Sequence, residues 1–276
     1  GTSGKNKKGA EFIFDQQHRL KVWCNYIFLM KIHIIGGGII GLCSAWYLAK
    51  EGNEVVVVDR SYLSDGTSHG NAGMVVPSHF MPLATPGVIG QGIRWMFNKR
   101  SPFFIKPRLN MELAQWLWQF YRACTPEKVA RAIPSLKHLN TWSRDLYREF
   151  DGLPGFDFDF EERGLLLLYK DTKVGEEEIE VAEKAHDLGM EAQILSAGEA
   201  QQLEPGIKLD VAGGVYYPGD AHLYPNTFIH QLVAQLKEAG VKFILGNGIE
   251  NFRSSKGKID QLLMTDGSSV DVQNVI

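Results

Sequence analysis

The hydrophobic pattern of this chain is clearest in residues 31–59, where it predicts a strand, a glycine turn, a helix and a second strand. The first strand, 32–35, is mostly apolar, and the second contains four consecutive valines, 55–58, which are typical of a strand buried on both faces. Between them, apolar residues recur at helical spacing over 42–50. Gly52 is expected to end this helix, because glycine readily adopts the left-handed conformation of a helix cap.

Farther along, short helices and strands alternate, and the middle of the chain is rich in hairpin signals. Phenylalanines alternate with polar residues over 156–160, and an apolar run over 165–169 follows the Arg163-Gly164 turn, so we predict a β-hairpin there. The other expected helices lie at 126–150, 176–188, 196–204 and 227–239, and the other strands at 191–195, 211–217, 241–245, 257–265 and 270–276. This order predicts an α/β fold with an inserted α+β domain.

Three glycines follow the first strand with the G-x-G-x-x-G spacing of a dinucleotide-binding turn. Gly36 allows the tight turn, Gly38 lets the backbone approach a pyrophosphate, and Gly41 lets the helix pack closely against the strand. Asp59 lies 23 residues after Gly36, near the offset of about 20 at which a carboxylate binds the adenosine ribose. Its charge disfavours the 2′-phosphate of NADP. The alternative is a glycine-rich turn in another kind of α/β protein. However, the strand, the helix and the acidic residue all occur at the positions that the dinucleotide-binding motif requires.

Composition excludes several other classes of protein. The net charge of −3 and the absence of long blocks of like charge give no sign of a nucleic-acid partner. The three cysteines, Cys24, Cys43 and Cys124, lack disulfide-framework or metal-ligand spacing, so we predict no metal site and a reducing, cytoplasmic setting. No apolar run approaches the roughly 18 residues that span a bilayer.

A long irregular connection, rich in Gly, Ser, Asn and Pro, follows Asp59-Arg60. Long loops of this kind are usually functional or disordered. Residues 67–73 suit contact with a flat ring that has polar edges. The glycine turn GGGIIGLCSAWYL, the TSxxNAG pattern of 67–73 and the ATPG of 84–87 resemble FAD-dependent amine and D-amino acid oxidoreductases, most closely bacterial D-amino acid dehydrogenases. The resemblance extends from Met30 to Ile276.

The resemblance implies FAD as the cofactor and a Rossmann-like domain that binds it. It also implies oxidation of a CH–NH2 group to an imine, which water hydrolyses to a 2-oxo acid and ammonia. Residues expected to hold the ADP half are Gly36, Gly38, Gly41, Asp59 and the adjacent Arg60, and those expected to approach the isoalloxazine are Thr67, Ser68, Asn71, Ala72 and Gly73.

Other functions stay open alongside a D-amino acid dehydrogenase. A glycine or sarcosine oxidase would use the same chemistry and differ in its electron acceptor, oxygen rather than a quinone. A protein that binds a nucleotide without catalysis is the alternative from another class. The sequence does not identify the amino acid, the oligomeric state or the cation that would bind the substrate carboxylate.

Three side chains are candidates for contact with the substrate. His79 follows the loop 67–73, and His222 lies in a Pro-Gly-Asp turn, although histidines in loops often have no catalytic role. Tyr216 and Tyr217 alternate across a strand, so only one can face a substrate, and Tyr217 is the candidate. The other tyrosine is expected to pack in the core.

Aromatic residues are concentrated between Ile93 and Tyr121. Four apolar residues, Leu113, Trp116, Leu117 and Phe120, fall on one helical face, which predicts a helix packed in the core. Trp118 and Tyr121 lie off that face and leave open a second contact, with a membrane surface, a partner or a substrate channel. The inner face of the cell membrane is therefore an alternative to a purely cytoplasmic location.

The expected domain boundaries follow from these elements. Residues 1–29 are interpreted as a non-native or disordered extension, 30–88 and 221–276 as the FAD-binding domain, and 89–220 as mainly the substrate domain. The helices at 126–150 are left open between the two domains. The resembled family continues past Ile276 with a segment that returns to the flavin, so we expect the 276 residues alone to bind FAD weakly and to turn over little substrate.

Overall fold

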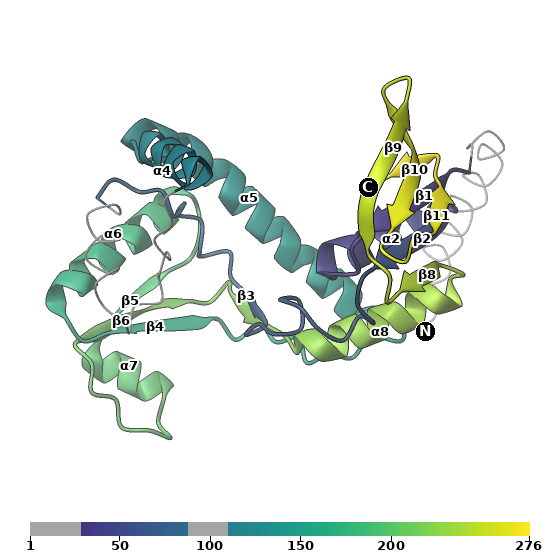
Figure 1. Cartoon of the computed structure of the whole chain (residues 1–276). Coiled ribbons are helices and arrows are strands. Elements are labelled where there is room, and N and C mark those ends of the chain that lie inside the picture. Colours follow the sequence, from purple (N-terminus) through teal and green to yellow (C-terminus); the bar gives the residue numbers. More distant parts are fainter. Residues whose placement is uncertain (1–28, 88–109) are drawn as a thin grey trace, which may run out of the picture. The chain divides into compact units, whose positions relative to one another are not determined.

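The computed structural model describes residues 29–87 and 110–276, and it divides into two compact units (Figure 1). Unit 1 is formed by the chain up to Gly70 together with Leu232–Ile276, and unit 2 by Asn71–Gln231. The expected boundaries at 88 and 220 differ from these, because residues 71–87 and 221–231 cluster with the inserted unit. The expected extension lies outside the described residues except for Leu29.

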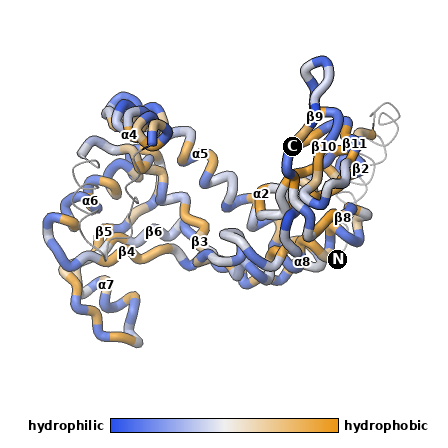
Figure 2. Tube along the Cα trace, in the orientation of Figure 1, coloured by the Kyte–Doolittle hydropathy of each residue, from blue (hydrophilic) through white to orange (hydrophobic). Residues whose placement is uncertain are grey.

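A four-stranded parallel sheet forms the centre of unit 1. Its strands are β1 (Lys31–Ile35), β2 (Glu54–Asp59), β8 (Lys242–Leu245) and β12 (Asn274–Val275), in the order β12-β1-β2-β8. The four valines of β2 are buried, as their pattern predicts. Figure 2, which colours the chain by hydropathy, shows hydrophobic stretches among the strands of unit 1. The predicted α/β fold is confirmed, and its sheet is parallel.

Helix α2 (Ile39–Lys50) connects β1 to β2 and begins three residues earlier than its apolar pattern suggests. Leu42 and Ala45 are fully buried on its inner side. Gly52 has a φ of +89°, the left-handed conformation expected just past the end of the helix. The strand-helix-strand unit is therefore determined by local sequence signals, namely the apolar strands and the glycines at the turn and at the end of the helix.

A small antiparallel sheet of β9 (Ile249–Ser255), β10 (Lys258–Met264) and β11 (Ser269–Asp271) completes unit 1. Leu262, Met264 and Val272 form a buried cluster with Val56 and Val58 of β2, so this sheet covers one face of the parallel sheet. The strand predicted at 270–276 is two strands, because β11 pairs with β10 while β12 pairs with β1. Strand β9 was not predicted, since its residues are mostly polar and exposed.

Unit 2 contains a three-stranded antiparallel sheet and a two-stranded ribbon. The sheet order is β4 (Leu165–Tyr169), β6 (Gly213–Tyr217), β5 (Gln193–Ser196), and the ribbon pairs β3 (Met74–Val75) with β7 (Ala221–His222). The helices are α4 (Met111–Ala123), α5 (Pro126–Asp151), α6 (Thr172–Asp187), α7 (Ala197–Leu203) and α8 (Pro225–Glu238), the last of which continues into unit 1. Ala182 and Ala185 of α6 pack with Val215, Tyr217 and Phe80 in the core.

The hairpin predicted over 156–169 is wrong. Strand β4 pairs with β6, and the only ladder contact described for 156–160 and its neighbours is a bridge between Glu161 and His222. Phe156 and Phe158 are instead buried against Phe228, with ring centroids 5.9 Å and 4.8 Å away. The alternation arises from an aromatic cluster rather than from a strand.

The prediction that the helical face of Leu113, Trp116, Leu117 and Phe120 packs in the core is also wrong. None of the residues of α4 is buried, and Trp116 and Leu117 are 48% and 44% exposed. The neighbouring aromatic residues Trp95, Phe97, Phe103 and Phe104 lie outside the described residues. Across 29–87 and 110–276, no helix combines the length and the apolar character needed to cross a membrane.

Candidate functional site

The glycine turn after β1 has the geometry that a close helix-strand contact requires. Gly36 has a φ of +106°, and its N–H donates to the carbonyl of Val58 at 2.8 Å. A Cβ added at Gly41 would lie 1.9 Å from the carbonyl oxygen of Gly36. Any side chain at position 41 would therefore push the helix away from the turn.

The amino end of α2 faces this turn, and the backbone N–H groups of a first helical turn carry partial positive charge. Gly38 is the N-cap residue, and no acidic side chain lies in the first turn of the helix. The hydroxyl of Ser68 accepts the N–H of Ile39 at 3.1 Å, and a Cβ at Gly38 would lie 3.3 Å from that hydroxyl. Ser68 thus contacts the end of the motif that binds phosphate in such folds, whereas the sequence predicts that it approaches the isoalloxazine.

Asp59, at the carboxyl end of β2, accepts three hydrogen bonds. Its Oδ2 accepts the N–H of Gly37 at 2.6 Å, and its Oδ1 accepts both the N–H and the hydroxyl of Ser61 at 2.7 Å. Partial burial alone would raise the pKa of Asp59, but the bonds from Gly37 and Ser61 and the charge of Arg60 outweigh it and lower the pKa. The carboxylate is therefore ionised at neutral pH and is held in one orientation.

The two carboxylate oxygens of Asp59 offer about four acceptor positions, of which three are used. The remaining position lies on Oδ2, the oxygen beside the glycine turn, and it suits a hydroxyl donor such as that of a ribose. Gly37 was not singled out in the sequence, although a Cβ there would lie 2.0 Å from the side chain of Leu63. The run of three consecutive glycines at 36–38 is the sequence signal that could have indicated a role for Gly37.

A cleft of about 480 Å³ lies at the carboxyl ends of β1, β2 and β8. Asp59 and Arg60 line it on one side, and the loop 246–249 and Thr265 on the other. Ligands of parallel α/β sheets bind at this edge of the sheet. The loop was missed in the sequence, although its Gly-Asn-Gly run directly follows a strand and is the signal that could have indicated it.

In unit 2, the predicted flavin-proximal residues Asn71, Ala72 and Gly73 are consecutive, and Gly73 contacts the segment after β7. Asn71 accepts the N–H of Gly73 at 2.8 Å, and the carbonyl of Gly73 accepts the N–H of Leu223 at 2.9 Å. Gly73 has a φ of +67°, and a Cβ there would lie 2.0 Å from the carbonyl oxygen of Leu223. Backbone packing is enough to explain why position 73 is glycine. Thr67 belongs to unit 1.

The substrate candidates of unit 2 differ in their surroundings. His222 is paired across the ribbon with Met74, its ring is half exposed, and its Nε2 lies 3.9 Å from Glu161. Tyr217 is only 3% exposed and packs in the core, where burial raises its pKa to about 12. Tyr217 is therefore the core member of the pair, although the sequence analysis names it as the candidate for contact with the substrate. Tyr216 points to the opposite face, and its hydroxyl donates to the carbonyl of Arg163.

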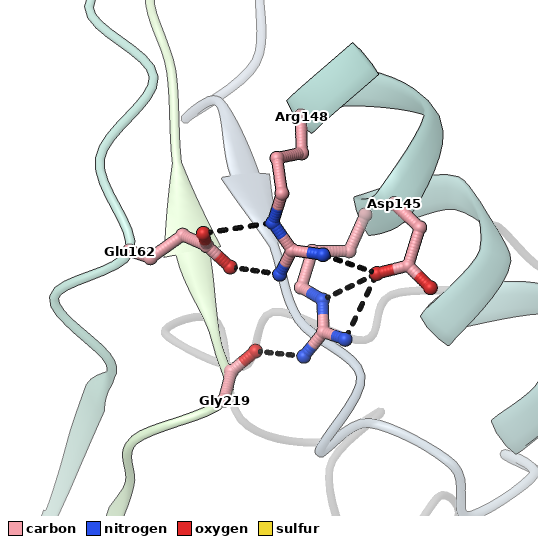
Figure 3. Close-up of polar contacts among 5 residues, drawn as sticks. Asp145, Arg148, Glu162 and Gly219 are labelled. Carbon is pink, nitrogen blue, oxygen red and sulfur yellow. Dashed lines mark hydrogen bonds and ion pairs between the residues drawn. The ribbon is translucent and has the colours of Figure 1, made fainter. Parts of the chain in front are cut away.

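A network of charged side chains ties α5 to the turns around β4 and β7 (Figure 3). The guanidinium of Arg148 binds both oxygens of Glu162, at 3.0 and 2.5 Å, and also binds Asp145. Arg144 binds Asp145 and donates to the carbonyl of Gly219 at 2.9 Å. The hydrogen bond from Arg148 lowers the pKa of Glu162. The network fixes the turn that precedes His222, and no local sequence signal indicates it.

A comparison with protein families decides the classification of the chain. The family model described as FAD dependent oxidoreductase (DAO) matches residues 31–276. The chain belongs to this family of FAD-dependent oxidoreductases.

Within 29–87 and 110–276, no group of three or more His, Cys, Asp or Glu side chains is arranged to hold a metal ion.

Curated relatives of this FAD-dependent oxidoreductase include D-amino acid dehydrogenases. The one from Granulibacter bethesdensis is 32% identical over 86% of this chain and 58% of its own length, and the one from Cereibacter sphaeroides is 32% identical over 87% and 56%. The chain thus spans little more than half the length of these relatives.

Solved structures share the fold at lower identity. Glycine oxidase from Geobacillus kaustophilus matches with a TM-score of 0.63 and 20% identity, over 89% of this chain and 54% of that one. L-proline dehydrogenase from P. horikoshii matches with a TM-score of 0.60 and 19% identity, over 89% and 51%.

The residues of unit 1 fit the ADP half of the cofactor that this family uses. The glycines at 36, 37 and 38 leave the turn before α2 without side chains, so that a pyrophosphate can approach its backbone. Asp59 retains one acceptor position beside that turn. Both features are set by the chain itself, without a ligand.

Proposed function

We propose that this protein binds FAD through unit 1 and oxidises the CH–NH2 group of a D-amino acid. The observation that carries the proposal is the ionised, oriented carboxylate of Asp59 beside a glycine turn that only glycine at position 41 can form. Family membership and the D-amino acid dehydrogenases among the relatives support the choice of substrate class. When bound, FAD would supply the acceptor for a hydride from the substrate.

Individual roles within the site are part of the same proposal. Asp59 accepts a ribose hydroxyl on Oδ2, and the amino end of α2 faces the pyrophosphate. Ser68, which already contacts Ile39 N–H, is assigned to the pyrophosphate end of FAD. Asn71, Ala72 and Gly73 are assigned to the isoalloxazine, and His222 to the substrate.

The proposal is tested by loading the purified protein with FAD and recording its absorption spectrum. A yellow protein that is bleached by D-amino acids under anaerobic conditions supports it, and a colourless protein that binds only NAD contradicts it. Glycine and sarcosine serve as the comparison substrates for the glycine oxidase alternative. Reoxidation of the reduced protein by oxygen or by a quinone then identifies the electron acceptor, for which we propose a quinone.

We also propose a cytoplasmic location with contact at the inner membrane surface through α4. The exposed aromatic residues Trp116, Trp118 and Tyr121 of this helix support the contact, since tryptophan and tyrosine favour the membrane interface. Co-sedimentation with phosphatidylglycerol vesicles tests it. Trp116→Gln together with Trp118→Gln should abolish binding, whereas Trp142→Gln, which changes an exposed tryptophan on α5, should not. Equal binding by all three proteins would contradict the assignment.

A further inference from the structure

A short loop of unit 1, residues 246–249, carries a hydrogen-bond network that the proposed roles of Asp59 and α2 do not explain. The loop follows β8 and lines the cleft of about 480 Å³ together with Asp59 and Thr265. That volume lies within the range of small-ligand pockets, about 300–1,000 Å³. The network therefore supports a surface that a ligand can reach.

Thr265, directly after β10, holds the second half of this loop. The backbone N–H of Thr265 donates to the carbonyl of Gly248 at 2.9 Å, and the N–H of Gly248 donates to Oγ1 of Thr265 at 3.1 Å. The same hydroxyl donates to Oδ1 of Asn247 at 2.8 Å. One side chain thus fixes two successive residues of the loop, and it needs a hydroxyl because the oxygen both donates and accepts.

The side-chain amide of Asn247 is fixed at its other end as well. The hydrogen bonds from Ser268, and after them the one from Asn247, lower the pKa of the Asp266 carboxyl. An ionised carboxylate only accepts, so Nδ2 of Asn247 donates to Asp266 while its Oδ1 accepts from Thr265. Both ends of the amide are therefore engaged within the protein, and the side chain of Asn247 holds the loop.

The first half of the loop is held from another side, by the residues that follow β2. The N–H of Gly246 donates to the carbonyl of Ser61 at 3.0 Å, and Gly246 has a φ of +72°. A Cβ at Gly246 would lie 2.6 Å from the hydroxyl oxygen of Tyr62. Contacts from two segments of unit 1 therefore order the loop without a ligand.

The order of the strands indicates which part of a nucleotide reaches this loop. Strand β2 lies between β1, which leads into α2, and β8, which leads into 246–249. The base and the 5′-phosphate are attached to opposite ends of a ribose. An ADP group with its ribose on Asp59 and its pyrophosphate at the amino end of α2 would therefore carry its base toward 246–249.

We propose that Thr265 is a positioning residue, which holds the loop 246–249 in place for the adenine of FAD and thereby gives the site its preference for a purine. This inference rests on the proposed function, in which Asp59 and α2 bind the rest of the ADP half. A loop that is ordered in advance loses little conformational entropy on binding, so more of its contact energy appears as affinity. Asn247 and Asp266 support Thr265 in this role.

The proposal is tested by calorimetric titration of the flavin-free protein with ADP and with UDP. Both probes carry the ribose and the diphosphate, but UDP has the smaller pyrimidine base, so the wild type should prefer ADP. Thr265→Val keeps the shape of the side chain and removes the hydroxyl. We expect this variant to bind ADP about tenfold more weakly, the ratio that corresponds to one net hydrogen bond, and to bind UDP almost as the wild type does.

Two further variants serve as controls. Thr265→Ser keeps the hydroxyl and should restore ADP affinity, whereas Ser255→Ala removes an exposed hydroxyl from the far end of β9 and should have no effect. Equal ADP affinity in the wild type and Thr265→Val overturns the proposal. An equal loss of ADP and UDP affinity also overturns it, because general damage to unit 1 has that result. A wild-type protein that binds neither ADP nor FAD contradicts the proposed function.

Amide hydrogen exchange, measured by NMR, reports on the loop without any nucleotide. The amide of Gly248 should exchange slowly in the wild type and in Thr265→Ser, and faster in Thr265→Val, because it donates to the hydroxyl of residue 265. The amide of Val272, which donates to the carbonyl of Asp260 in the same antiparallel sheet, should keep its rate and shows that unit 1 is folded. Equal exchange of the Gly248 amide in all three proteins overturns the role of Thr265.

Discussion

Replacing Gly41 with alanine is the most direct test of the glycine turn. A Cβ at this position would lie 1.9 Å from the carbonyl oxygen of Gly36 and 3.3 Å from the side chain of Ile34. An ordinary contact begins near 3.4 Å, so the amino end of α2 must move by about 1.5 Å from the turn. Such backbone shifts cost about 1–3 kcal/mol. They oppose the gain of about 1 kcal/mol that alanine gives over glycine within a helix.

We therefore expect Gly41→Ala to lower the free energy of unfolding of unit 1 by up to about 2 kcal/mol and to weaken FAD binding at least tenfold. Chemical denaturation and titration with FAD measure the two effects. Gly198→Ala in α7 is the matched control, because a Cβ there meets nothing within 4 Å and the variant should gain stability. Unchanged stability and unchanged FAD affinity in Gly41→Ala would refute the close contact between helix and turn.

Two further predictions concern the same site. Asp59→Ala should weaken FAD binding by about 1.5–3 kcal/mol, the range for a hydrogen bond to a charged group, as measured by titration, whereas an unaffected affinity would show that another residue binds the ribose. Because the folded pKa of Asp59 is lowered, its contribution to stability is present above the unfolded pKa and is lost as pH falls through the folded pKa. Denaturation curves of wild-type and Asp59→Asn protein should therefore converge below about pH 4.

Local signals explain why one part of the fold was predictable and another was not. Four consecutive valines and three spaced glycines predict the strand, the turn and the helix of 31–59, and all of these signals lie within one short segment. At 156–160 the alternation of phenylalanines has the period of a strand, but burial against Phe228 of α8 produces the same pattern. Only the tertiary structure separates these two causes.

The helix α4 illustrates a second limit. Its periodicity correctly predicts a helix, but periodicity shows only which residues share a face, not what covers that face. The contact between Asp220 and Ser78 illustrates a third, because the two residues are 142 positions apart and neither belongs to a recognisable motif. Ion pairs such as the one between Arg148 and Glu162 cannot be predicted from the sequence either, because each of these charged side chains could equally have been exposed to solvent.

His33 in β1 leads to a prediction about acid stability. Its ring is only 1% exposed, and its Nδ1 has no hydrogen-bond partner among the described residues. Burial and the charge of Lys31 lower the pKa of His33, and Glu54 opposes this weakly. A lowered pKa means that the unfolded chain binds a proton more readily than the folded chain. The contribution of a neutral His33 is therefore present above the unfolded pKa of about 6.5 and is lost as pH falls from there through the folded pKa.

This loss has an upper limit, since one proton changes the free energy of unfolding by at most about 1.4 kcal/mol per pH unit. Replacement by a branched apolar residue of similar size, His33→Ile, removes both the proton and the unpaired nitrogen, and its side chain suits a buried strand. We expect the variant to be at least as stable as the wild type at pH 7 and to lose less stability between pH 6.5 and pH 5. Urea unfolding at several pH values gives the two slopes, and His230→Gln, which changes an exposed histidine, is the control. Equal slopes in the wild type and His33→Ile would mean that His33 is not the group whose protonation destabilises the parallel sheet.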